Sequence, residues 1–230
     1  MDVDGCALPE DRLYDLEQDV WFRWDPDGTT GVVGILGSLA SFAGRFTAVT
    51  YRPVDGTLAA GRSVATIESV RFTGAVRLPV TARIVDRNPA LPARPKLLND
   101  APFTDGWVVR VAPTEPAAVA AQLAGADRVQ EALKAKIAAL KIRCYPAAPD
   151  VELYEIGAEC SAILARLDDE IARLAPGEVV LLVTDDPTSP IELVRWSDRT
   201  GHALLAHRVE DRLQHFLIRR EAHPVPRRRR

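Results

Sequence analysis

The sequence predicts a two-domain α+β chain, with an all-β N-terminal domain and a C-terminal two-layer α/β sandwich. Up to about residue 110 the chain is rich in Gly, Thr and Val, in short runs that alternate apolar and polar residues as strands do. Residues 116–141 then change to Ala, Leu, Gln and Lys at helical spacing, and the remainder alternates strand-like and helix-like segments. The length of 230 residues suits two domains, because one domain usually has about 100–200 residues.

The N-terminal elements follow from alternation and from turn residues. Strands are predicted at residues 31–35, 47–51 and 82–86. Asp-Gly pairs and a further glycine predict turns at residues 25–28, 54–56 and 60–61. A short helix is expected over residues 37–42, and Gly44 should end it.

The segment 116–141 predicts one helix, or two helices with a break at Gly125, because apolar residues recur three or four positions apart. These residues are Val129, Leu133, Ile137 and Leu140. Residues 144–149 contain two prolines, which prevent the helix from continuing and make this stretch the natural linker. We therefore predict a domain boundary near residue 145.

The C-terminal part predicts the order β-α-β-α-β-β. Its strands are expected at 151–156, 179–183, 203–209 and 212–219, and its helices at 161–174 and 191–200. This order gives a four-stranded sheet with both helices on one face. Residues 221–230, which end in the run Arg227–Arg230, are expected to form a disordered, solvated tail.

Composition excludes a largely disordered chain and a spanning membrane protein. Hydrophobic residues make up 47% and charged residues 27%, and the formal net charge is -3. No stretch approaches the roughly 20 apolar residues of a membrane-spanning helix, and no secretory signal is evident, so we expect a cytoplasmic protein. Arginine dominates the basic residues, since only Lys96, Lys134, Lys136 and Lys141 are lysines.

The three cysteines are Cys6, Cys144 and Cys160. They form no CxxC pair, so the sequence indicates neither a disulfide framework nor a zinc site, and no metal is expected. Cys6 falls in an N-terminal segment that should be mobile, and we interpret it as incidental.

Residues 10–140 resemble the glycine cleavage H-protein family. The resemblance runs in order through 20–23 (VWFR), 54–61 (VDGTLAAG), 67–70 (IESV) and 95–107 (PKLLNDAPFTDGW). It implies a barrel-sandwich hybrid fold over residues 8–142, with a lysine on a hairpin tip that carries lipoate through an amide. It also implies protein partners on which such a carrier docks.

Arg71 stands where that lysine is expected, directly after Glu68-Ser69-Val70. Lipoate attachment needs a primary amine, and a guanidinium cannot act as the acceptor. No lysine occurs before Lys96, which we interpret as a solvated loop residue. We therefore expect no lipoate cofactor. Glu68 and Arg71 are either a plain polar hairpin tip or part of a docking surface.

Residues 150–220 resemble the TusA/SirA-like sulfurtransferases, which carry sulfur as a cysteine persulfide. The matching residues are 157–160 (GAEC), 176–178 (PGE), 185–187 (DDP), Gly201-His202 and 216–219 (FLIR). The resemblance implies that Cys160 is the persulfide carrier. The family's Cys-Pro-x-Pro is replaced here by Cys160-Ser161-Ala162-Ile163.

Cys160 is predicted just before a helix, where the dipole and free N–H groups stabilise a thiolate, while Glu159 opposes it. The alternative is a small, buried, inert side chain. Cys144 is a weaker candidate, as a second, resolving thiol. Asp185 and Asp186 are interpreted as turn and cap residues rather than as a metal or acid/base pair, and His202 as structural.

Three functions remain open from the sequence. The first is a sulfur carrier that relays persulfide sulfur through Cys160, with an unlipoylated docking module. The second is a non-catalytic adaptor in which both modules have lost their chemistry. The third is an H-type carrier of glycine cleavage. In each case we expect a carrier or accessory protein rather than a stand-alone enzyme, with protein partners and neither membrane nor nucleic-acid binding.

Overall fold

The computed structural model describes residues 1–224, so residues 225–230 of the predicted tail 221–230 lie outside the described residues. Within the tail, Glu221 is held by contacts with His202 and Arg219. The chain divides into two compact units, Met1–Cys144 and Tyr145–Arg230, which we describe separately. Within the described part of the chain, no helix is both long and apolar enough to cross a membrane.

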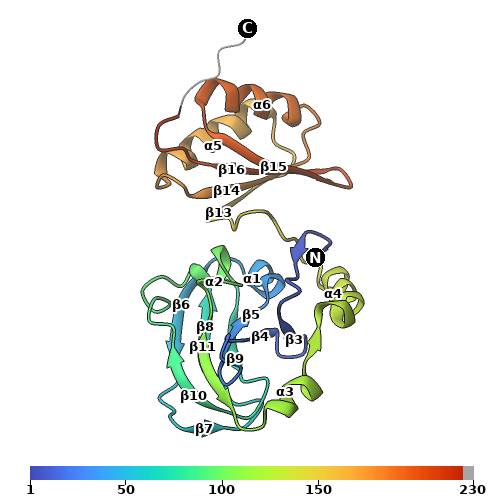
Figure 1. Cartoon of the computed structure of the whole chain (residues 1–230). Coiled ribbons are helices and arrows are strands. Elements are labelled where there is room, and N and C mark those ends of the chain that lie inside the picture. Colours follow the sequence, from blue (N-terminus) through green and yellow to red (C-terminus); the bar gives the residue numbers. More distant parts are fainter. Residues whose placement is uncertain (225–230) are drawn as a thin grey trace. The chain divides into compact units, whose positions relative to one another are not determined.

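The N-terminal unit is built from antiparallel sheets (Figure 1). The largest has seven strands in the order β12 (Ala124–Gly125), β3 (Leu13–Asp15), β4 (Val20–Trp24), β5 (Gly31–Ile35), β11 (Val109–Pro113), β10 (Ala82–Arg87) and β7 (Thr57–Leu58). A second sheet contains β6 (Phe46–Tyr51), β8 (Ser63–Ser69) and β9 (Thr73–Arg77). The first two strands, β1 (Asp2–Val3) and β2 (Cys6–Ala7), form a separate hairpin. The predicted barrel-sandwich hybrid is confirmed.

The large sheet buries apolar residues on both faces. Alternation along β4 directs Phe22 into the core shared with the three-stranded sheet and Trp21 into a second core on the other face. The second core is covered by α4 (Ala126–Leu140), whose Val129, Leu133 and Ile137 lie on one helical face, as the spacing predicts. The helical region breaks at Gly125, after α3 (Pro116–Gln122).

In the stretch 95–107, Asn99 and Gly106 are required by close contacts with backbone atoms. It contains α2 (Leu97–Asp100), which lies near α1 (Gly37–Ala43). Asn99 accepts a hydrogen bond from the Phe46 N–H at 2.9 Å, and its amide donates to the carbonyls of Ala40 at 3.2 Å and Gly44 at 2.8 Å. A side chain at Gly106 would meet the Leu97 carbonyl oxygen at 2.5 Å, so only glycine fits there.

The C-terminal unit is a two-layer sandwich with the strand order β13 (Val151–Glu155), β14 (Val179–Thr184), β16 (Leu213–Arg219) and β15 (Ala203–Glu210). β13 and β14 are parallel, and the other pairs are antiparallel. The helices α5 (Cys160–Arg173) and α6 (Ser189–Thr200) cover one face, as predicted (Figure 1). Along β14, Val180 and Leu182 face these helices, while Leu181 belongs to a separate apolar cluster.

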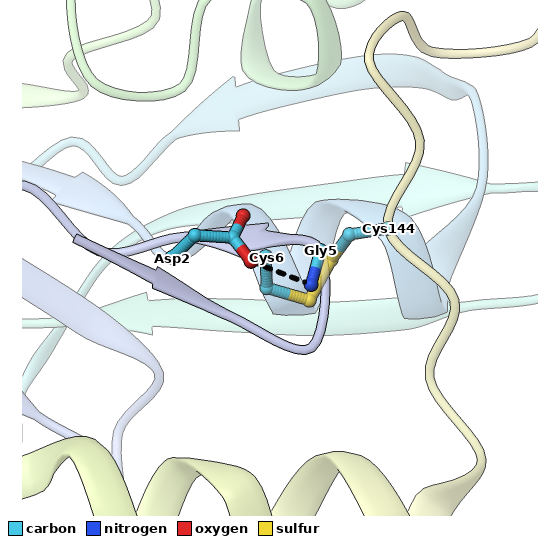
Figure 2. Close-up of a disulfide and its surroundings, with 4 residues drawn as sticks. All are labelled: Asp2, Gly5, Cys6 and Cys144. Atoms are coloured by element: carbon cyan, nitrogen blue, oxygen red, sulfur yellow. Dashed lines mark hydrogen bonds between the residues drawn. A yellow bond between two sulfur atoms is a disulfide. The ribbon is translucent and has the colours of Figure 1, made fainter. Parts of the chain in front are cut away.

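The expectation that Cys6 is incidental and lies in a mobile segment was wrong. Cys6 is fully buried, and its sulfur is bonded to that of Cys144, 138 positions away (Figure 2). The turn before Cys6 is well defined, since Gly5 has a φ of 86° and its N–H donates to Asp2 Oδ1 at 2.9 Å. No short-range pattern signals this bond, because the two residues are 138 positions apart in the sequence.

Asn99→Ala should lower the free energy of unfolding of the N-terminal unit by about 1–3 kcal/mol, because it leaves the Phe46 N–H and two carbonyls without their partner. Urea unfolding followed by tryptophan fluorescence measures this, since Trp21, Trp24 and Trp107 all lie in this unit. Arg83→Ala, at an exposed position of β10, is the control and should change stability by less than about 0.5 kcal/mol. Equal effects of the two substitutions would contradict the role of Asn99.

Candidate functional site

The hairpin between β8 and β9 forms the first candidate site. Its tip is Val70-Arg71-Phe72, and Val70 is 99% exposed. Glu68 pairs with Thr73 across the hairpin and is exposed. Arg71 thus lies at the tip, where the resemblance places the carrier lysine.

The side chain of Arg71 folds back onto the end of α1. Its Nε donates to the Phe42 carbonyl at 3.2 Å and its Nη2 to the Ser41 carbonyl at 3.3 Å. Ser69 adds a hydrogen bond from its hydroxyl to the Ala43 carbonyl at 2.7 Å. These carbonyls belong to the last turn of the helix, where a cation also meets the negative end of the dipole. Arg71 therefore fastens the tip to α1.

A cavity of about 250 Å³ lies next to this hairpin. Its apolar lining includes Phe42, Phe72, Leu140 and Ile142, and its charged lining includes Glu17, Asp19, Arg77 and Lys136. Lys136 Nζ and Asp19 Oδ1 form an ion pair at 2.6 Å. Burial nevertheless raises the pKa of Asp19 above its ordinary value.

Lys96 is not part of the hairpin. It directly precedes α2, and its Nζ is 3.2 Å from Asp100 Oδ1, one helical turn along. The amine is thus engaged in a local ion pair beside a second cavity, of about 480 Å³, which Arg45 and Arg94 also line.

The second candidate site is at the carboxyl ends of β13 and β14, the two parallel strands. Cys160 is the first residue of α5, is half-buried, and is the free thiol among the three cysteines. The loops from β13 to α5 and from β14 to α6 meet at this edge, where the Gly157 N–H donates to Asp185 Oδ1 at 2.7 Å. Binding sites of α/β sheets commonly lie at this end of parallel strands.

Asp186 organises the second loop. Its Oδ1 accepts hydrogen bonds from the N–H and the hydroxyl of Thr188, both at 2.7 Å, and its own N–H donates to Thr184 Oγ1. Both aspartates therefore act as turn residues. Within residues 1–224, no group of three or more His, Cys, Asp or Glu side chains is arranged to hold a metal ion.

The thiol of Cys160 is harder to ionise than its position at a helix start predicts. Burial raises its pKa, the carboxylates of Asp186 and Glu192 raise it further, and a hydrogen bond with Thr188 lowers it. Together these causes leave the pKa of the thiol above its ordinary value. The sequence identified Glu159 as the opposing acid, but the acids that act come from the loop before α6 and from α6 itself.

His202 follows the helix-ending Gly201 and is far along the sheet from Cys160. Its Nδ1 accepts a hydrogen bond from the Glu221 N–H at 3.2 Å, and its ring lies against Trp196. Burial lowers its pKa, so it is neutral near pH 7, as the accepting Nδ1 requires.

The two units define a class of protein: a carrier-type β scaffold joined to an α/β sandwich with a cysteine at a helix start. The chain belongs to the glycine cleavage H-protein family, whose family model matches residues 12–136. The model of the sulfurtransferase TusA matches residues 155–220, so the C-terminal unit is a TusA domain. The predicted fusion of the two families is confirmed.

Curated relatives match the N-terminal part. Glycine cleavage system H protein 5 of Aquifex aeolicus is 35% identical over 147 residues, which are 62% of this chain and 98% of the relative. A probable H protein 2 of Saccharolobus solfataricus is 31% identical, over 61% of this chain and 95% of the relative. The crystal structure of an H protein from Mycobacterium marinum matches with 25% identity and a TM-score of 0.48, over 55% of this chain and 98% of that one.

Asp186→Asn should accelerate alkylation of Cys160 by iodoacetamide several-fold at about pH 7.5, because loss of a neighbouring negative charge lowers the thiol pKa and increases the thiolate fraction. The pH dependence of the rate gives the pKa, which in the wild type should exceed that of a free cysteine. Asp169→Asn, nine residues further along α5, changes the charge equally and should leave the rate unchanged. A wild-type pKa below the ordinary value would contradict this account.

Proposed function

We propose that this protein carries sulfur as a persulfide on Cys160 and passes it to a partner thiol. The observation that carries the proposal is a free, half-buried cysteine at the first residue of α5, within the segment that matches the TusA model. The other two cysteines are bonded to each other, so sulfur can be loaded onto one residue without competition.

The step balances without an external oxidant. The Cys160 thiolate attacks the sulfane sulfur of a persulfide or polysulfide donor, a new S–S bond forms at Cys160, and the donor's S–S bond breaks with release of a thiolate or hydrosulfide. An acceptor thiolate then attacks the terminal sulfur and releases the Cys160 thiolate. A raised pKa reduces the thiolate fraction, but it increases the nucleophilicity of the thiolate that is present.

The N-terminal module serves as an unlipoylated docking scaffold in this proposal. Its hairpin tip presents an exposed Val70 and an arginine in place of an amine, and the same arginine fastens the tip to α1. The partners are proteins of sulfur transfer or of lipoate-linked metabolism, and we place the exchange in the cytoplasm, where acceptor thiols stay reduced.

A second candidate function is a non-catalytic adaptor, which the raised pKa of Cys160 favours. An adaptor binds its partners through the same surfaces but accepts no sulfur at Cys160. The two functions therefore differ in one measurable property, the gain of sulfur mass.

Intact mass spectrometry of the unreduced protein, before and after treatment with polysulfide, should show the wild type gaining whole sulfur atoms and Cys160→Ser gaining none. The double variant Cys6→Ser/Cys144→Ser keeps only Cys160 and should still gain sulfur. No gain in the wild type would overturn the carrier and leave the adaptor. Gain through Cys144 alone, after reduction of the disulfide, would move the carrier role to that residue.

Incubation with a lipoate ligase, lipoate and ATP should leave the wild type without a lipoyl group, because the hairpin tip offers no primary amine. Arg71→Lys supplies the amine at the same position and should gain one lipoyl group by mass. Arg71→Ala removes the contact with α1 and supplies no amine, and should gain none. A lipoyl group on the wild type would favour the third function, an H-type carrier.

A further inference from the structure

We propose that the Cys6–Cys144 disulfide is a redox-sensitive clasp, which holds the N-terminal hairpin and the end of α4 in place when oxidised and releases both when reduced. The clasp comprises β1, β2, the disulfide and residues 141–144. It goes beyond sulfur carriage, and it does not depend on whether Cys160 accepts sulfur.

The hairpin is attached to the domain through few types of contact. The backbone hydrogen bonds of β1 and β2 join these strands to each other, in a two-stranded sheet apart from the larger ones. Val3, Cys6 and Leu8 are buried in the second core, against α4. Apolar burial and the covalent bond to Cys144 therefore hold the hairpin down (Figure 2).

The backbone at Gly5 allows the two segments to approach closely at the disulfide. A side chain added at Gly5 would lie 3.2 Å from the Cys144 carbonyl oxygen, and Gly5 has a positive φ of 86°. The backbones of the two segments thus approach closely at the point where the sulfurs join.

The other end of the bond lies next to the cavity beside the hairpin tip. Helix α4 ends at Leu140, Lys141 adopts a left-handed conformation, and Ile142 is anchored by a hydrogen bond from its N–H to the Ile137 carbonyl at 2.9 Å. Leu140 and Ile142 line the cavity. Reduction frees Cys144, two residues further on, so this side of the cavity loses its covalent link to the N-terminal hairpin.

The reductant is a dithiol. Its thiolate attacks Sγ of Cys144, the half-buried partner, and the Cys6 thiolate leaves. The second thiol of the reagent then attacks the mixed disulfide, so that two electrons and two protons end on Cys6 and Cys144 and the reagent becomes a cyclic disulfide. In a reducing compartment, disulfides that form are typically transient and redox-sensing.

Hydrogen–deuterium exchange of the full chain, with and without dithiothreitol, tests the clasp. Peptides covering residues 1–9 and 138–144 should exchange at least about tenfold faster after reduction, whereas a peptide from β8, which pairs on both sides, should be unchanged. Cys144→Ser in the absence of reductant should reproduce the reduced state. Cys160→Ser should respond to dithiothreitol as the wild type does, which separates the clasp from sulfur carriage.

Thiol titration under denaturing conditions provides the second measurement, because Cys6 is fully buried in the folded protein. One thiol is expected after oxidation of the protein with diamide and three after reduction with dithiothreitol, in agreement with one free and two paired cysteines. Three thiols in the diamide-treated protein would overturn the clasp, because no bond would then exist. Equal exchange in the oxidised and reduced states would also overturn it, because the bond would then hold nothing in place.

Discussion

The N-terminal unit depends on one constraint, a sheet that is apolar on both faces. Because Phe22 and Trp21 are neighbours on β4 and both are buried, the sheet needs a layer on each side. The three-stranded sheet supplies one layer, and α4 with the N-terminal hairpin supplies the other. The cavity beside the β8–β9 hairpin is lined by residues of both layers, such as Phe72 and Arg77 of the hairpin and Lys136 of α4.

Local signals in the sequence predicted most of the fold. The turn at residues 25–28 connects β4 and β5, Gly44 ends α1, and Gly125 separates α3 from α4. These features depend on neighbouring residues, so periodicity and turn chemistry suffice to predict them. The disulfide depends on a contact across 138 positions, and an odd number of cysteines without a short-range pattern gave no indication of it.

The sequence predicted where in the fold Arg71 and Cys160 lie, but it did not predict which groups surround them. The resemblances located Arg71 on a hairpin tip and Cys160 at a helix start, and both lie there. The contacts of Arg71 with the end of α1 join residues about 30 positions apart, and the acids that oppose the Cys160 thiolate lie in the next loop and helix. A helix-dipole argument considers only the helix itself, so it takes no account of these acids.

Arg71 restricts the motion of the hairpin tip. A carrier lysine on a tip swings freely, and a partner must immobilise it before contact becomes productive. Here the guanidinium already holds the tip against α1, so a partner that covers Val70 meets a surface whose conformational freedom was lost during folding. In the proposed docking role, the hairpin would therefore offer a preorganised surface rather than a flexible arm.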